Sequence, residues 1–211
     1  MQQKRKRNST KSLYIIGSLL ILSSISIILN KHFNEKQINK FEEISIQEYY
    51  EEVKDEKEEI EEIKEIKDYP KEEIKKNQNV VNYIAVLRIP KINLKRGLVN
   101  KDSKYNDIKY NIMIHDKSTY PDEIGGNVIL IAHSGNSNIS FFKNLYKLEL
   151  DDIIYLDYNN DTYKYKLINI YDIEKKGKAL IKKDSKNSTI TLITCRSNTN
   201  KQIVLIGELI A

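Results

Sequence analysis

Residues 188–195 read Ser-Thr-Ile-Thr-Leu-Ile-Thr-Cys, an apolar and β-branched run that ends on the only cysteine of the chain. Thr and Ile are enriched in strands, and a short run of this kind predicts a buried β-strand. Similar runs recur from about residue 80 onward, separated by turn residues. The predicted strands are 83–89, 127–133, 152–158, 162–172, 188–195 and 202–209.

The connections between these strands are short. Tyr158-Asn159-Asn160-Asp161 predicts a tight hairpin turn, because Asn and Asp tolerate the backbone conformation that such turns need. Only short helices are expected, near 103–110 and 140–145. Strands without long helices between them favour an all-β barrel or sandwich over a parallel α/β sheet.

The N-terminus has a different pattern. Residues 13–29 read LYIIGSLLILSSISIIL without a charge, and they follow a basic cluster at 4–11. This stretch reaches the lower end of what crosses a hydrocarbon core of about 30 Å, and its serines can bond to carbonyls of their own helix. The basic cluster predicts a cytoplasmic N-terminus and an extracellular remainder. The rival interpretation, a cleavable signal peptide, lacks a small-residue cleavage site after the run.

Composition divides the chain into four parts. They are a basic cytoplasmic N-terminus (1–12), a transmembrane anchor (13–30), a charged helical stalk (31–79) and a β-domain (80–211). The stalk is dense in Glu and Lys, with Ile60, Ile63 and Ile66 as a thin apolar stripe. A coiled-coil or docking segment is one interpretation. We favour a solvated helical spacer that breaks near Pro70.

The net charge of +5 does not indicate a nucleic-acid-binding protein. Five positive charges lie on the N-terminal side of the predicted membrane span, where a basic cluster marks the cytoplasmic face. The remainder of the chain is close to neutral. These residues are Lys4, Arg5, Lys6, Arg7 and Lys11. Nucleic acid is therefore not an expected partner.

Two reactive side chains follow apolar strands. Cys195 ends the run at 188–195, and His133 ends the run at 127–133. A free thiol with a pKa of about 8.5 is only a few per cent thiolate at neutral pH, so a nearby imidazole would serve as its proton partner. Each residue also has an ordinary interpretation, as a small buried cysteine or a loop histidine. His115 follows an apolar run as well.

In combination, these motifs resemble those of the sortases, the membrane-anchored cysteine transpeptidases of Gram-positive bacteria. The segments that carry the resemblance are IPKIN at 89–93, NVILIAHSG at 127–135, FFKNL at 141–145, TLITC at 191–195 and the final strand at 201–211. It covers about residues 80–211. The resemblance implies a closed eight-stranded β-barrel with short helices, preceded here by one transmembrane helix and the helical stalk.

The resemblance also implies a reaction. Cys195 would attack the carbonyl before the scissile bond of a sorting motif similar to Leu-Pro-x-Thr-Gly, forming an acyl-thioester. His133 would protonate the leaving amine and deprotonate the incoming one. The implied partners are surface proteins with a C-terminal sorting motif and an amine from a peptidoglycan precursor or another acceptor, at the outer face of the cell membrane.

No cofactor is expected, although calcium activation occurs in some sortases. Four loop carboxylates are available as calcium ligands, and solvated acidic turns explain them equally well. They are Asp122, Glu123, Asp151 and Asp152. A zinc site is a minor alternative, because one Cys with two His has no recognisable ligand spacing.

The sequence departs from the family at the third catalytic residue, an arginine at the start of the last strand. Lys201 and Gln202 occupy that place, and the nearest arginine is Arg196. We assign the role to Arg196, because a guanidinium can hold a carbonyl with two directed donors, and Lys201 is the competing cation. Regular alternation after Cys195 would point Arg196 to the opposite face unless the strand bends.

Two other classes of function stay open. An extracellular cell-wall cysteine peptidase also needs Cys and His, but papain-like enzymes place the nucleophile on a helix and the histidine after it. A non-catalytic, membrane-anchored binding module would merely pack Cys195 and His133. The sequence shows no lid segment typical of pilus-polymerising sortases, which favours an anchoring role.

Overall fold

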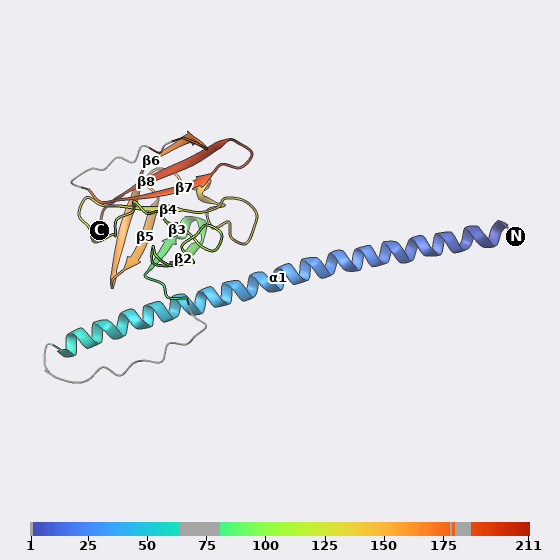
Figure 1. Cartoon of the computed structure of the whole chain (residues 1–211), viewed down its shortest axis with the longest axis horizontal. Helices are drawn as coiled ribbons and strands as arrows, with labels where there is room; N and C mark the ends of the chain where they lie inside the picture. The colour runs from blue at the N-terminus through green and yellow to red at the C-terminus, as the bar shows by residue number, and fades with distance from the viewer. Residues whose placement is uncertain (1, 64–80, 178, 180–186) are drawn as a thin grey trace. The chain divides into compact units, whose positions relative to one another are not determined.

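The computed structural model describes residues 2–63, 81–177, 179 and 187–211 (Figure 1). The chain forms two compact units, Met1–Phe41 and Glu42–Ala211. The first unit is the N-terminal part of helix α1 (Gln2–Ile63). The second unit contains the remainder of α1 and all the strands of the described residues, and it holds Cys195, His133 and Arg196.

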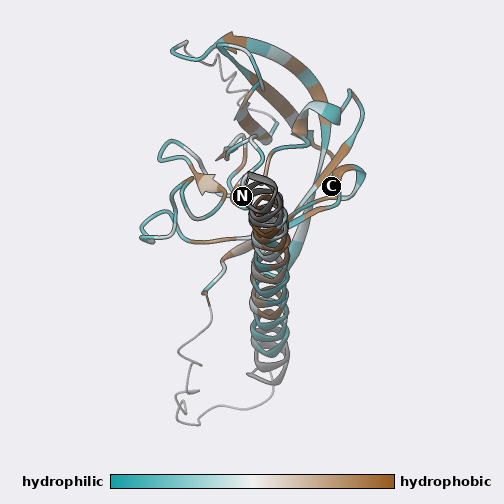
Figure 2. Cartoon of the chain, turned by 90° about the vertical axis from the view of Figure 1, so that its right-hand side faces the viewer, coloured by the Kyte–Doolittle hydropathy of each residue, from teal (hydrophilic) through white to brown (hydrophobic). Residues whose placement is uncertain are grey.

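The N-terminal part of α1 carries the apolar stretch, and Figure 2 shows the change from apolar to polar turns along the helix. This stretch is long and apolar enough to cross a membrane and is a candidate span by its length and composition. Ser18, Ser23 and Ser24 donate hydrogen bonds of 2.8–2.9 Å to the carbonyls of Ile15 and Leu20. The expectation that serines bond back to their own helix is confirmed at these three positions.

The second unit is built on one eight-stranded sheet that curls into a nearly closed barrel (Figure 1). The strands are β1 (Ala85–Ile89), β2 (Leu94–Leu98), β3 (Met113–Ile114), β4 (Asn127–Ile131), β5 (Ile153–Tyr158), β6 (Asp161–Glu174), β7 (Thr189–Cys195) and β8 (Lys201–Leu209). Their order in the sheet is β2-β1-β5-β6-β8-β7-β4-β3. Neighbouring strands are antiparallel except β4 and β7, which run parallel. The expected all-β barrel is confirmed.

Strand β7 is buried on both faces, which explains why its sequence, Thr-Ile-Thr-Leu-Ile-Thr-Cys, contains no charged residue. On one face Ile190 and Leu192 pack into the main core of the barrel. On the other face Ile193 packs in a second cluster with Val204 and Ile206 of β8. One face of β7 therefore packs in the main core of the barrel, and the other face packs in the second cluster.

The predicted hairpin turn is confirmed. Tyr158 and Asp161 pair directly across β5 and β6, so that the turn has two residues. Asn159 and Asn160 have φ angles of 48° and 67°, in the left-handed region that a tight hairpin requires at both positions. Asparagine adopts this conformation more readily than most residues.

The two short helices expected near 103–110 and 140–145 are not found there. Residues 103–110 form turns, because the Asn106 side chain binds the backbone of Lys101 and Ile114 and so competes with helical hydrogen bonds. The second segment is mostly turn, followed by a single 3₁₀ turn, η2 (Leu145–Lys147). Another 3₁₀ turn, η1 (Pro90–Ile92), joins β1 to β2.

The first half of the predicted stalk is not a solvated spacer throughout. Ile46 and Tyr49 of α1 are buried in a cluster with Tyr83, Val86 and Val99, so this part of the helix packs on the barrel. The sequence contains the signal, since Ile46, Tyr49, Tyr50 and Val53 recur at helical spacing, whereas the predicted apolar stripe lies farther along, at Ile60, Ile63 and Ile66. The break expected near Pro70 lies outside the described residues, and the proposed domain bounds stay a prediction.

Two buried carboxylates attach the helix to the barrel. The first is Glu42, which accepts hydrogen bonds from the Tyr83 hydroxyl at 2.6 Å and the Gly97 N–H at 2.8 Å. It also lies 3.0 Å from the Arg96 guanidinium. Burial, followed by the neighbouring carboxylate of Glu42, raises the pKa of Tyr83 far above its ordinary value. A Cβ at Gly97 would lie 2.1 Å from the Tyr83 ring, so only glycine allows this close approach.

The second carboxylate is Asp157 of β5. It accepts two hydrogen bonds from Arg88, at 2.6 and 2.7 Å, one from Thr162 at 2.7 Å, and one from the hydroxyl of Tyr50 on α1. Burial by itself would raise the pKa of Asp157, but these hydrogen bonds outweigh it and the pKa is lowered. Glu42 and Asp157 are thus satisfied by partners from distant parts of the chain.

Candidate active site

The parallel pairing of β4 and β7 places His133 and Cys195 at the same end of the barrel. The register runs to Ile131 opposite Ile193. Strand β4 ends at Ile131, two residues before His133, and β7 ends on Cys195 itself. Beyond the register, Ala132 donates its N–H to the Ile193 carbonyl at 3.3 Å. The C-terminal ends of the two strands therefore lie side by side.

Both reactive residues are half-buried. Two hydrogen bonds hold the backbones around them together. The Ser134 hydroxyl, next to His133, donates to the carbonyl of Cys195, and the Thr194 hydroxyl donates to the carbonyl of Ala132 at 2.7 Å. The arrangement keeps a thiol and an imidazole on neighbouring strand ends and leaves both accessible, as nucleophilic catalysis requires.

The neighbour of Cys195 on β8 is Gln202. These residues pair across the two strands, and the preceding pair on the same face is Ile193 with Val204. Side chains directly opposite in an antiparallel pair lie on one face, with Cβ atoms about 5 Å apart. Gln202 is therefore the polar side chain of β8 beside Cys195. It stands at the place of the family's arginine, and the sequence alone did not indicate a role for it.

Arg196 lies on the other face. Its backbone N–H donates to the Lys201 carbonyl at 2.9 Å, so the pairing of β7 and β8 continues one residue past Cys195. Its Nε donates to Asp172 at 2.6 Å, and Asp172 pairs with Ile203 across β6 and β8. Alternation places Lys201 on that face as well. The structure thus brings neither cation to the face of Cys195, and the role of Arg196 stays a prediction.

A cavity of about 300 Å³ adjoins Cys195. Its lining includes Thr194, Arg196 and Ile203 of the strand ends, and Phe142 and Lys143 of the segment after His133. Gln202 and Val204 are not part of this lining. The cavity therefore lies on the Arg196 face of the sheet and reaches Cys195 at its edge.

His115 has a structural role. Its N–H donates to the Ile129 carbonyl at 2.9 Å, beside the middle of β4. Its Nδ1 accepts the N–H of Lys117 at 3.1 Å. His115 therefore closes the turn after β3, and His133 alone of the two lies at the end of β4.

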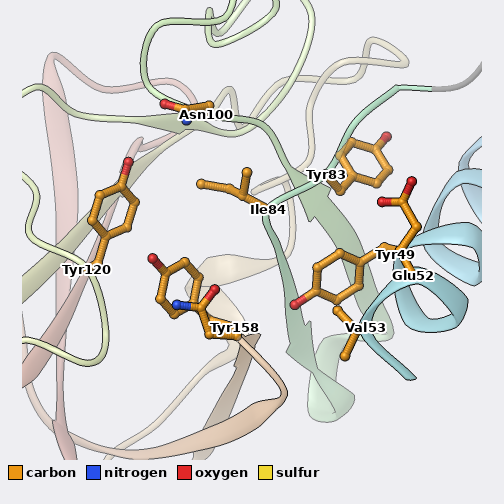
Figure 3. Close-up of a pocket in the computed structure, with 9 residues that line it drawn as sticks. Tyr49, Glu52, Val53, Tyr83, Ile84, Asn100, Tyr120 and Tyr158 are labelled. Atoms are coloured by element: carbon orange, nitrogen blue, oxygen red, sulfur yellow. The ribbon is translucent and has the colours of Figure 1, made fainter. Parts of the chain in front are cut away.

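A second cavity, also of about 300 Å³, lies at the opposite end of the barrel between α1 and the loops that precede β4 and follow β5 (Figure 3). Four tyrosines line it: Tyr49, Tyr83, Tyr120 and Tyr158. The rings of Tyr120 and Tyr158 stack with centroids 5.4 Å apart. No Cys or His contributes to its lining, so this cavity is separate from the reactive pair.

Within the residues that the structure describes, no three His, Cys, Asp or Glu side chains come together to hold a metal ion. Two of the candidate calcium ligands are engaged with lysines: Asp152 lies 2.9 Å from Lys91, and Asp151 lies 3.4 Å from Lys166. The expectation that the protein needs no cofactor stays a prediction.

Comparisons with known proteins point to one family. The family model described as the sortase domain matches residues 87–210. Sortase A of Staphylococcus aureus is 22% identical over 198 residues, which cover 93% of this chain and 92% of that protein.

Two solved structures are similar in fold. A Clostridium perfringens sortase D5 transpeptidase has a TM-score of 0.59 at 21% identity, covering 82% of this chain and 99% of that one. A Clostridium perfringens sortase C, solved with the C-terminal cell wall sorting motif, has a TM-score of 0.54 at 21% identity, covering 62% of this chain and 71% of that one. Because the family model spans more than half of the sequence, the chain belongs to the sortase family.

Proposed function

We propose that this protein is a cysteine transpeptidase that joins surface proteins to an amine of the cell wall. The observation that carries the proposal is the position of half-buried Cys195 and His133 on the adjacent ends of the parallel strands β4 and β7. Membership of the sortase family supports it. The N-terminal candidate span would hold the barrel at the outer face of the membrane, with the N-terminus in the cytoplasm.

The reaction would proceed in two steps. In the first, the Cys195 thiolate attacks the carbonyl carbon of the sorting motif, the C–N bond breaks, and the leaving amine takes a proton from the His133 imidazolium. In the second, an incoming amine attacks the thioester carbon and gives its proton to His133. The C–S bond then breaks and regenerates the Cys195 thiolate. Water in place of the amine gives hydrolysis as a side reaction.

The donor substrate would be an extended C-terminal sorting motif similar to Leu-Pro-x-Thr-Gly. One of the similar structures was solved with a C-terminal cell wall sorting motif, which supports a sorting motif as the class of substrate for the present chain. We place the motif on the face of Cys195 that continues the apolar cluster of Ile193, Val204 and Ile206. An apolar surface suits the leucine and proline of the motif.

The developing oxyanion needs a hydrogen-bond donor beside Cys195. Arg196 is our sequence-based candidate, but its ion pair with Asp172 lies on the other face. Gln202 is the structural candidate, because its side chain shares the face of Cys195 and carries an amide N–H₂. If Gln202 supplies the donor, Gln202→Ala lowers the rate of thioester formation about 100-fold, whereas Arg196→Ala and Lys201→Ala change it little. If Arg196→Ala lowers the rate strongly and Gln202→Ala does not, the oxyanion donor is Arg196.

Mass spectrometry of the detergent-solubilised full chain tests the proposal. The protein is incubated with a mixture of peptides similar to Leu-Pro-x-Thr-Gly, with and without glycylglycine as the amine. We expect a thioester adduct on Cys195, absent in Cys195→Ala, and an amine-linked product when glycylglycine is present.

Two other results would each contradict the proposal in favour of a different class. Hydrolysed peptide without any amine-linked product would indicate a cell-wall peptidase. An unreacted Cys195 across the whole mixture would indicate a binding module in which the thiol is merely packed.

A further inference from the structure

The cavity beside Cys195 has a buried floor and a polar rim. Phe142, Thr194 and Ile203 form the floor, with exposed fractions of 0%, 3% and 2%. The rim is polar and more exposed, and it includes Ser134, Lys143 and Arg196. At about 300 Å³ the cavity is at the lower end of the range for small-molecule sites.

The cavity and the proposed sorting-motif face lie on opposite sides of β7. The lining uses Thr194 of β7 and Ile203 of β8, which pair with one another, and it omits Gln202, the partner of Cys195. A thioester on Cys195 would therefore have its acyl chain on one side of the strand and open space on the other. A second substrate can approach from that open side.

The charge of the cavity is positive. Lys143 and Arg196 line it, and no carboxylate of the described residues does. Arg196 is neutralised by Asp172 at 2.6 Å. Lys143 is exposed and, among the described residues, has no ion-pair partner, so its ammonium is available to a ligand. A cavity with one unpaired cation and several hydroxyls favours a small polar ligand that carries a carboxylate.

We propose that this cavity binds the amine acceptor, and that the preferred acceptor carries a carboxylate as an amino acid or short peptide does. The inference rests on the proposed function, because only a transpeptidase uses a second substrate. Lys143 would bind the carboxylate, and the amine would point towards Cys195. In the transfer step, the amine nitrogen forms the new C–N bond, the C–S bond breaks, and the amine proton passes to His133.

The partition of the thioester between amine and water tests this site. Glycylglycine and glycylglycinamide differ only in the C-terminal charge. A difference between them in the ratio of amine-linked to hydrolysed product therefore measures the effect of the acceptor's carboxylate. We expect the native protein to prefer glycylglycine. Lys143→Gln should reduce the ratio for glycylglycine about 3-fold and Lys143→Glu about 10-fold, while the ratio for glycylglycinamide changes less.

A matched control and a salt series sharpen the test. Lys117→Glu makes the same charge change on an exposed lysine of the loop before β4, outside the cavity, and it should leave the ratio unchanged. The preference for glycylglycine should shrink in about 1 M salt, where the Debye length is about 3 Å.

The outcomes separate the two proposals. If no thioester forms on Cys195, the proposed function fails. If the thioester forms but the ratio of amine-linked to hydrolysed product responds neither to the acceptor's charge nor to the substitutions at Lys143, the acceptor site is wrong.

Discussion

The junction between α1 and the barrel differs from the C-terminal ends of β4 and β7 in how its polar groups are satisfied. At the junction, Asp157 is 6% exposed and receives hydrogen bonds from Arg88, Tyr50 and Thr162. At the strand ends, Cys195 and His133 are half-buried. The comparison separates two uses of polar side chains: those at the junction stabilise the fold, and those at the strand ends stay available for chemistry.

The largest effect that would sharpen this comparison is a loss of activity without a loss of stability. His133→Ala should lower the rate of thioester formation about 1000-fold, because it removes the general acid. The free energy of unfolding should change little, since the imidazole is half-buried in a loop. Intact-mass kinetics and urea denaturation of the solubilised chain measure the two quantities. His115→Ala is the control, and a comparable loss of rate there would remove the distinction between the two histidines.

The next effect is a loss of stability without a loss of activity. Arg88→Ala should lower the free energy of unfolding by about 3 kcal/mol, because it leaves the buried carboxylate of Asp157 without its cation. The rate of thioester formation per folded molecule should stay near the native value. Lys91→Ala is the matched control, since its partners Glu149 and Asp152 pair with it near the surface, where water screens the charges, and it should lower the free energy of unfolding much less than Arg88→Ala. Equal losses in both variants would mean that the junction is not a stabilising region.

The smallest effect is a change in the acid dependence of stability. The pKa of Asp157 is lowered in the folded chain, so the unfolded chain takes up a proton at a higher pH than the folded one. This contribution to stability is present above the unfolded pKa of about 4 and is lost as the pH falls through the folded value. Asp157→Asn should therefore flatten the decline of the unfolding free energy below about pH 4. Urea denaturation across that range measures the slope, and an unchanged slope would contradict the lowered pKa.

Local patterns predicted most of the barrel. The run at 188–195 and the turn Asn159-Asn160 became a strand and a hairpin as expected, because alternation, β-branching and turn chemistry act between neighbouring residues. Strand β2 was missed, since its Lys95, Arg96 and Gly97 give no apolar pattern. Its edge position in the sheet explains why polar residues are tolerated there.

The attachment of the helix was also missed. Tyr50 and Glu42 stand in a stretch dense in charge, where a solvated helix was the simpler expectation. Their partners are Asp157, Arg96 and Gly97, which are distant in the sequence. The helical spacing of Ile46, Tyr49, Tyr50 and Val53 indicates that this helix packs on an apolar surface, but which residues it meets there depends on how the strands assemble.

The sequence by itself determined the family, the all-β class and the two residues proposed for covalent chemistry, because short motifs and strand patterns are properties of adjacent residues. Only the tertiary structure decided which face each polar side chain occupies at the end of β7. Cys195 pairs with Gln202, and Arg196 turns to Asp172. The reason is the two-residue period of a strand: a shift of one residue in register exchanges the faces, and the register is set by contacts between strands.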